Sequence, residues 1–244
     1  MRCAAVFCLL ISLVSYRALA FEEQVDIHIK VVTEDTFPVQ YIENGVITGP
    51  ATKLVEQVLI TANLKYDIEV LPWARAYYLA RTEPNVLIYS LARTPAREKH
   101  FKWIGRIMAL DYYLYGAVDA NIGFSTPIAA LKNYRIGTVR DSAVDQHLRA
   151  NGFKNLTTVV QGTQNFHLFA QKRIDLLPAN QSSFQAICLQ YAFNCEALKP
   201  LYKLDISSID LFMAFSRLSS DHIVEKVHSA YQQVMKKRKA LLAL

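Results

Sequence analysis

Two apolar periodicities alternate along most of this chain of 244 residues, and they limit its fold more than any other feature. Apolar side chains occupy every second position of residues 26–32 and nearly every position of residues 85–91, as in strands. In residues 51–64 and 220–242 the apolar side chains recur about every 3.6 residues, as in helices. Strands that alternate with helices pack as sheets covered by helices. The sequence therefore predicts an α/β fold with largely parallel sheets. Further strands are expected over 66–71, 134–139, 156–160, 174–177 and 211–215, and further helices over 73–81, 143–151 and 165–172.

The first 20 residues have the composition of a secretion signal. Arg2 supplies a positive charge, residues 3–15 are mostly apolar, and residues 18–20 (ALA) form a small-residue cleavage site. An apolar run of about 13 residues is too short to span a bilayer. A buried amino-terminal helix is the alternative. We expect the signal peptide 1–20 to be cleaved after Ala20, and the mature chain to be exported to the periplasm without being embedded in a membrane.

The mature chain carries a mild positive charge. The full chain has a formal net charge of +6, which falls to +4 without Arg2 and Arg17 because residues 1–20 contain no acid. Part of this charge lies in residues 236–239 (KKRK), which we interpret as the solvated face of a terminal helix. An exported chain with so small a charge lacks the phosphate-tracking surface that nucleic-acid binding requires. We therefore expect that the chain binds no nucleic acid. We also expect it to be a monomer.

Cys188 and Cys195 are the cysteines that remain after removal of the signal peptide. A single pair in an oxidising compartment predicts a disulfide rather than a metal site. Seven residues of helix would separate their Cα atoms by about 10 Å, more than the roughly 4.4–6.8 Å that a disulfide allows. The helix must therefore end between them, and Asn194 is a candidate terminator.

Residues 90–103 (SLARTPAREKHFKW) concentrate cationic side chains after a predicted buried strand. Thr94-Pro95 has the form of a helix N-cap followed by a proline at the first helical position, so Arg97 is expected in the first turn of a helix. A cation there is disfavoured by about 0.3–1 kcal/mol unless an anion lies nearby. Arg97 is thus either a candidate anion-binding residue or a surface arginine paired with Glu98 or another acid. Residues 126–127 (TP) predict a second helix start of the same form.

Five segments resemble, in the same order, motifs of one protein family. Residues 33–41 (TEDTFPVQY) resemble a Y-P-P-F loop, 47–50 (ITGP) a G-F-x-x-D-L segment, 71–76 (LPWARA) a P-W-x-R-A signature, 90–97 (SLARTPAR) the pattern S-x-[ST]-x-T-x-x-R, and 210–216 (DLFMAFS) the strand before the terminal helix. Through these motifs and their spacing, nearly the whole mature chain is similar to the bacterial extracellular solute-binding proteins of family 3. These are periplasmic receptors mainly for amino acids and related polar solutes.

The resemblance implies the type II periplasmic binding fold. In that fold two α/β lobes, each a mainly parallel sheet flanked by helices, are joined by two crossing strands that act as a hinge, and the solute is trapped between the lobes. The aromatic run 111–116 (DYYLYG) falls where the first crossing belongs, and the second is expected near 205–210. The resemblance also implies where the lobes begin and end. Lobe 1 comprises 21–115 and 209–244, and lobe 2 comprises 116–208.

The resemblance also implies a set of ligand-binding residues. Arg97 occupies the position of an arginine that holds a ligand carboxylate, a task that suits the planar guanidinium. Ser90 and Ala92 fall beside it, and Ala92 lacks the usual hydroxyl. Ser142 lies in a segment, GTVRDS, that resembles the turn G-V-Q-x-G-[ST] of the second lobe, with Asp141 in place of the glycine.

Asn180 departs from the family pattern in an informative way. Residues 174–180 (IDLLPAN) resemble D-A-x-x-x-D, whose last aspartate receives the ligand's α-ammonium group. A charge-assisted hydrogen bond contributes about 1.5–3 kcal/mol, against about 1 kcal/mol for a neutral one. We therefore hypothesise a ligand that carries an anionic or polar group but is not an ordinary α-amino acid.

Trp73, Tyr41 and Tyr112 are candidates for aromatic walls of the cleft, and Arg75 for a second anion contact. Packing in the core is the alternative for each aromatic residue, and a structural ion pair is the alternative for Arg75.

The leading functional prediction is a solute receptor that delivers its ligand to the permease of an ABC importer or to a sensor protein. It predicts no cofactor, no metal and no catalytic residue. One alternative is an enzyme on the same scaffold, similar to cyclohexadienyl dehydratases, for which Glu34 or Asp35 could be the acid. Another is a degenerate domain used for protein interaction.

Overall fold

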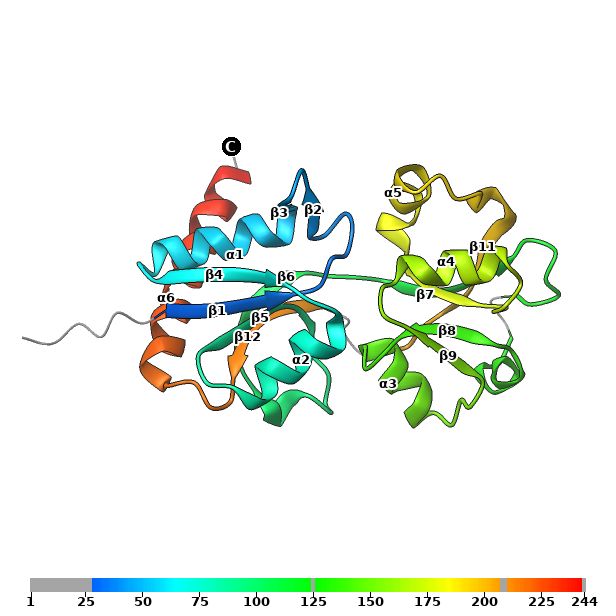
Figure 1. The fold of residues 1–244 in the computed structure, drawn as a ribbon, viewed down its shortest axis with the longest axis horizontal. Helices are drawn as coiled ribbons and strands as arrows, with labels where there is room; N and C mark the ends of the chain where they lie inside the picture. The colour runs from blue at the N-terminus through cyan, green and yellow to red at the C-terminus, as the bar shows by residue number, and fades with distance from the viewer. Residues whose placement is uncertain (1–27, 124–125, 207–209, 243–244) are drawn as a thin grey trace, which may run out of the picture.

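The computed structural model describes residues 28–123, 126–206 and 210–242, which form two α/β lobes (Figure 1). The expected signal peptide lies outside these ranges. Within them, no helix is both long and apolar enough to cross a membrane. The two-lobed α/β fold predicted from the sequence is confirmed.

The first lobe is built on a five-stranded sheet in the order β4-β1-β5-β12-β6. Strand β1 runs parallel to β4 and β5, whereas β12 runs antiparallel to β5 and β6. A small hairpin of β2 and β3 accompanies the sheet. The strands are β1 (His28–Thr33), β2 (Tyr41–Glu43), β3 (Val46–Thr48), β4 (Lys65–Val70), β5 (Val86–Ala92), β6 (Phe101–Met108) and β12 (Leu211–Ser216).

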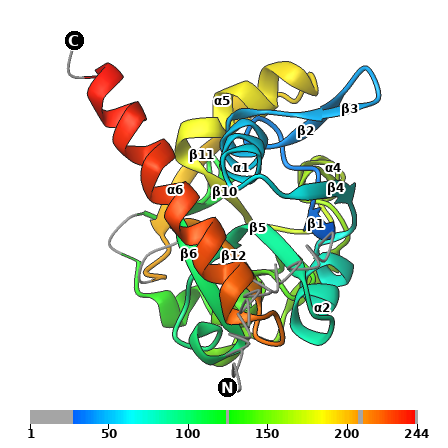
Figure 2. The same ribbon diagram turned by 90° about the vertical axis from the view of Figure 1, so that its left-hand side faces the viewer.

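Helices cover both faces of this sheet, so its central strand β5 is buried along its whole length. Leu87 and Tyr89 face the core formed with α1 (Pro50–Thr61) and α6 (Asp221–Leu242), while the alternate residue Ile88 faces α2 (Trp73–Thr82). Figure 2 shows α6 lying diagonally across the sheet, in front of β6 and β12. The near-continuous apolar run of β5 is therefore the pattern of a strand buried on both faces.

The second lobe contains β7, β8, β9, β10 and β11. Strand β7 lies between β10 and β11 and is antiparallel to both. Strands β8 and β9 are parallel, and an isolated bridge joins Ile136 of β8 to Leu176 just before β10. The strands are β7 (Tyr112–Ala117), β8 (Ile136–Val139), β9 (Leu156–Val159), β10 (Leu177–Asn180) and β11 (Leu198–Lys203). The helices are α3 (Ala143–Ala150), α4 (Thr163–Ala170) and α5 (Gln181–Gln190), with 3-10 helices η2 (Ile128–Asn133) and η3 (Cys195–Ala197).

In the first lobe β12 alone runs against the other four strands, whereas the second lobe combines the antiparallel strands β10, β7 and β11 with the parallel pair of β8 and β9, so the second lobe is less parallel than predicted. The strands β1, β5, β8 and β10 end at the cleft between the lobes, whereas β7 and β12 begin there. A strand that enters a lobe from its neighbour runs away from the cleft. It must therefore lie antiparallel to strands that run toward the cleft.

The first crossing between the lobes spans residues 109–111, because β6 ends at Met108 in one sheet and β7 begins at Tyr112 in the other. Most of the run 111–116, where the crossing was expected, forms β7. The second crossing was expected near 205–210. Strand β11 ends at Lys203 and β12 begins at Leu211, and residues 207–209 lie outside the described residues. The predicted lobe boundaries remain a proposal, and the pairing of β7 favours an end of the first lobe near Met108.

The sequence predicted that one helix begins at Thr94-Pro95 and another at Thr126-Pro127. Both predictions are wrong, because neither pair begins an α-helix. Residues 93–97 make a turn in which the backbone N–H groups of Arg97 and Glu98 donate to the Thr94 carbonyl, and only η1 (Glu98–His100) follows. The reason is length, since only eight residues separate β5 from β6. Arg97 is thus the residue before a 3-10 turn. Pro127 likewise precedes η2, which is 3-10 rather than α-helical.

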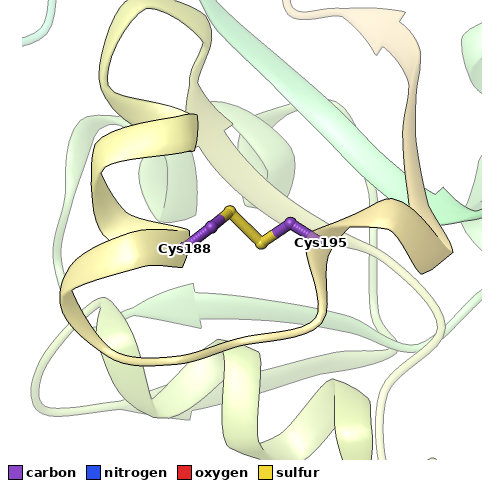
Figure 3. Close-up of a disulfide and its surroundings, with 2 residues drawn as sticks. All are labelled: Cys188 and Cys195. Carbon is purple, nitrogen blue, oxygen red and sulfur yellow. A yellow bond between two sulfur atoms is a disulfide. The ribbon is translucent and has the colours of Figure 1, made fainter.

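The predicted disulfide between Cys188 and Cys195 is present, with Cα atoms 5.9 Å apart. Figure 3 shows it linking the last turn of α5 to the segment that follows. The helix ends at Gln190, as the spacing requires. The left-handed residue at this end is Ala192 (φ 52°) and not Asn194 (φ −75°), so the predicted terminator is wrong. The turn is closed where the Phe193 N–H donates to the Cys188 carbonyl at 3.0 Å.

Candidate ligand-binding site

A cavity of about 150 Å³ lies between the two lobes. Its walls are the ends of the strands that run toward the cleft and the starts of α3, α4 and α5, which is where open α/β sheets bind ligands. An apolar cavity of about this volume holds benzene, so the site suits a solute of roughly six to ten non-hydrogen atoms. Seven of the nine predicted ligand-binding residues line the cavity: Trp73, Ser90, Ala92, Arg97, Tyr112, Ser142 and Asn180.

Arg97 is almost fully buried, with 1% of its surface exposed. Its guanidinium lies 4.8 Å from the ring centroid of Tyr77 and 5.4 Å from that of Trp73, which is within the range of cation–π attraction. Nη1 donates to the Ala92 carbonyl at 3.3 Å and Nη2 to the Asp141 carbonyl at 3.0 Å. Burial lowers the pKa of Arg97, but arginine starts so high that it stays charged.

Two side chains of the first lobe converge on one backbone oxygen of the second lobe. The Trp73 indole Nε1 donates to the Asp141 carbonyl at 3.0 Å, and Arg97 Nη2 donates to the same oxygen. We call these three residues the Asp141 clasp. Asp141 has φ 59°, a left-handed conformation that aspartate tolerates better than most residues. The departure from glycine seen in the sequence is therefore compatible with the turn.

The turn that carries Asp141 is held by a buried carboxylate that the sequence analysis missed. Asp145, 3% exposed, accepts hydrogen bonds from Thr138 Oγ1 (2.8 Å), from the Asp141 N–H (3.3 Å) and from Arg149 Nε (3.1 Å). Ser142 caps α3 by accepting from the Asp145 N–H at 3.1 Å. The spacing Ser142-x-x-Asp145 is a capping signal that could have identified this carboxylate.

Asn180 lines the cavity, but its carbonyl oxygen is already occupied. Oδ1 caps α5 by accepting from the Ser183 N–H at 3.2 Å, and it also accepts from the hydroxyls of Ser182 (2.6 Å) and Ser183 (3.0 Å). Nδ2 donates to the Asp111 carbonyl at 3.3 Å. Asn180 therefore lacks both the charge and a spare acceptor for an ammonium group.

The acids Glu34 and Asp35 follow β1 and line the cavity from the first lobe. Burial raises the pKa of Glu34 to about 7, although a hydrogen bond from Thr36 and the charge of Arg97 act in the opposite direction. Burial also raises the pKa of Asp35 and that of the Tyr112 phenol. Near neutral pH, Glu34 can therefore either accept or donate a proton within the site.

Ser90 reaches the cavity from the end of β5 with φ 58°. Its hydroxyl donates to Gln40 Oε1 at 2.7 Å, and Gln40 is itself only 1% exposed. This buried pair joins β5 to the loop that carries Glu34. Its geometry keeps the strand end and the loop in register around the cavity.

The structure does not place Tyr41 or Arg75 on the cavity. Tyr41 packs edge-on against Phe37, with ring centroids 4.9 Å apart, and it is Phe37 that lines the cavity. Arg75 is exposed, with its guanidinium 5.7 Å from the Tyr78 ring. It lies two residues after Trp73 in α2, about 200° around the helix, so the two side chains face opposite ways.

Asn165 is a cavity residue that the sequence analysis missed. It lies in the first turn of α4 and is 2% exposed. Its Oδ1 sits against Gly137 of β8, where a Cβ atom would come within 2.4 Å of it. The pattern that predicted a helix from residue 165 could not show this contact, because it depends on a strand 28 residues earlier.

Scans against protein-family models and curated protein sequences found no match. Solved structures do match. A histidine kinase sensor domain with similarity to periplasmic binding proteins aligns with a TM-score of 0.76 at 13% identity, over 87% of this chain and 92% of that chain. An arginine-bound Gly52Ala mutant of ArgBP from T. maritima aligns with a TM-score of 0.71 at 14% identity, over 85% and 95%.

The substrate-binding protein of an amino acid ABC transporter aligns with a TM-score of 0.70 at 14% identity, over 86% of this chain and 94% of that chain. This chain has the two-lobed fold of periplasmic binding proteins. At these identities the likeness shows the fold alone. In the described ranges, no group of three or more His, Cys, Asp or Glu side chains is placed to hold a metal ion.

Proposed function

We propose that this protein is a periplasmic solute-binding protein that captures a small carboxylate-bearing solute by closing its two lobes around it. The observation that carries the proposal is the cavity between the lobes, which combines a buried arginine from one lobe with three helix starts from the other. The three similar structures named above are two binding proteins and a sensor domain, and they support the same conclusion.

The carboxylate is supported by the electrostatics of the site. Arg97 is the cation in the cavity wall, and the amino-terminal ends of α3 and α4 face the cavity from the second lobe. Helix starts carry partial positive charge and unpaired N–H groups, which favour an anionic group. Because the Asn180 carbonyl is used to cap α5, the site has no aspartate-like partner there for an α-ammonium group. A solute other than an ordinary α-amino acid fits this arrangement best.

The partner that receives the loaded protein is proposed by analogy with the similar structures. One of them belongs to an ABC transporter and another to a histidine kinase. Delivery to a permease or to a sensor in the periplasm is therefore the proposed role, and export to the periplasm remains part of the proposal.

Thermal melting of the mature protein against a panel of organic acids, amino acids and short peptides tests the proposal. A solute at 100 times its Kd should add about 2.7 kcal/mol to the free energy of unfolding. Arg97→Ala should abolish this response, and retained affinity would contradict the assignment of Arg97. Absence of any response in the wild-type protein would contradict solute binding and favour an interaction domain.

An enzyme is the second candidate, because a carboxyl group with a pKa raised to about 7 inside a cavity suits general acid catalysis. Analysis of the solute after incubation separates the two functions. Recovery of the unaltered solute supports a receptor, and its conversion by the wild-type protein but not by Glu34→Gln supports an enzyme.

A further inference from the structure

A row of aromatic rings runs from the first lobe into the second along one edge of the cavity. Its ring-centroid distances are 4.9 Å for Tyr41–Phe37, 6.3 Å for Phe37–Tyr191, 6.0 Å for Tyr191–Phe193 and 4.9 Å for Phe193–Phe166. Phe37 and Phe166 line the cavity. Phe37 lies in the loop between β1 and β2, and Tyr191 follows the last residue of α5, so their contact joins the two lobes.

Tyr191 lies at the rim of the cavity. Its ring meets that of Phe37 edge-on at 89°, an arrangement that aromatic pairs favour at this distance. Ile187, one helical turn earlier on the same face of α5, lines the cavity, and its carbonyl accepts from the Tyr191 N–H at 3.0 Å. Burial and the charge of Asp35 in the first lobe raise the pKa of the Tyr191 phenol. The side chain of Tyr191 is therefore directed toward the first lobe.

The disulfide closes the turn that carries Tyr191 and Phe193 (Figure 3). Ala192, between these two aromatic residues, has φ 52°, a left-handed conformation that alanine adopts only at a cost. The turn is pinned at both ends, because the Phe193 N–H donates to the Cys188 carbonyl and the Cys195 N–H donates to the Phe193 carbonyl, each at 3.0 Å. The cross-link therefore restrains a turn that opposes the preference of its own sequence.

We propose that Tyr191 docks on Phe37 and holds the two lobes closed over the cavity, and that the disulfide between Cys188 and Cys195 positions Tyr191 for this contact. The inference rests on the proposed function and adds a residue to the capture of the solute. Phe37 and Ile187 are among the described residues that line the cavity, whereas Tyr191 is not. Tyr191 thus acts through Phe37 and not by touching the solute.

The two tryptophans of the chain allow lobe closure to be measured without a solute. Trp73 is 3% exposed and donates to the Asp141 carbonyl of the second lobe, so separation of the lobes exposes its indole. In Trp103→Phe protein the tryptophan fluorescence comes from Trp73 alone. Quenching of that fluorescence by acrylamide then reports the fraction of molecules with open lobes.

Four changes are made in this Trp103→Phe background. Tyr191→Ala removes the ring, and Tyr191→Phe keeps it. Replacement of both Cys188 and Cys195 by alanine removes the cross-link. Leu189→Ala is the matched control, because it shortens a side chain of the same turn that is 83% exposed.

Tyr191→Ala should raise the quenching of Trp73 about two- to tenfold, as expected for the loss of one edge-on aromatic contact. Tyr191→Phe and Leu189→Ala should match their parent. The cysteine replacement should raise quenching as Tyr191→Ala does, and combining the two changes should add nothing, because the disulfide acts through Tyr191.

Unchanged quenching in Tyr191→Ala overturns the inference. Strong quenching of Trp73 already in the parent protein does the same, because the contact would then not hold the lobes together. If the cysteine replacement lowers the urea midpoint but leaves quenching unchanged, the disulfide is only a structural cross-link and its positioning role is wrong. Failure to bind any carboxylate contradicts the proposed function separately, because quenching is measured without a solute.

Discussion

Replacing Glu34 by glutamine should remove a pH dependence of stability that the cavity creates. Burial raises the pKa of Glu34 from an ordinary value of 4.5 to about 7, so the folded protein binds this proton more tightly than the unfolded chain does. The free energy of unfolding contributed by this group is therefore fully present below pH 4.5 and falls as the pH rises toward 7.

The size of the effect follows from the shift. Each pKa unit corresponds to about 1.36 kcal/mol, so a shift to about 7 gives an upper value of about 3 kcal/mol. Because Glu34 is only half-buried in this structure, solvent screening reduces the expected loss between pH 4.5 and 7.5 to about 1–2 kcal/mol. Glu34→Gln is neutral at every pH and should be more stable than the wild-type protein by this amount at pH 7.5.

Urea unfolding at pH 4.5, 6.0 and 7.5 measures these differences. The control is Glu43→Gln, an exposed acid in β2, which should change the free energy of unfolding by less than about 0.5 kcal/mol. Parallel pH curves for Glu34→Gln and the wild-type protein would refute the argument that burial in the cavity perturbs Glu34.

Two further predictions concern the clasp and the disulfide. Trp73→Phe removes the indole N–H that donates to the Asp141 carbonyl but keeps a ring against Tyr77. The loss of this hydrogen bond, about 0.5–1.5 kcal/mol, should make a bound solute dissociate about two- to tenfold faster, as measured by stopped-flow fluorescence. An unchanged dissociation rate would mean that the clasp does not hold the lobes together. Replacing both Cys188 and Cys195 by alanine opens a short loop with a sequence separation of 7. This change should lower the free energy of unfolding by about 2–3 kcal/mol. Equal urea midpoints for the variant and the non-reduced wild-type protein would show that the disulfide does not stabilise the second lobe.

The sequence predicted the fold because the fold depends on local periodicity. The apolar run of β5 and the 3.6-residue repeat of α6 each appear within a single segment. The disulfide was predictable for a similar reason, since two cysteines in an exported chain have few alternatives. Arg97 was identified through its motif. The helix expected around it does not form, because the segment between β5 and β6 is too short for one.

The parts of the site that the sequence did not predict depend on contacts between distant segments. The acceptor in the Asp141 clasp is a backbone carbonyl, which every residue has. No pattern of residue types therefore predicts the clasp. Asn180 resembled a ligand-binding position, yet the neighbouring serines draw its side chain into a helix cap. Asn165 can pack against β8 because Gly137 has no side chain, and no sequence pattern links these two residues.

The central claim is that the solute lies between the lobes, and a blocked cavity tests it most directly. Ala143 is the first residue of α3 and lines the cavity, whereas Ala150 is the exposed last residue of the same helix. The measurement is calorimetric titration of Ala143→Trp, Ala150→Trp and the wild-type protein with the solute found by thermal melting. We predict no measurable affinity for Ala143→Trp, provided that its own melting curve shows a folded protein, and wild-type affinity for Ala150→Trp. Wild-type affinity in Ala143→Trp would contradict the account, because the solute would then bind outside the cavity.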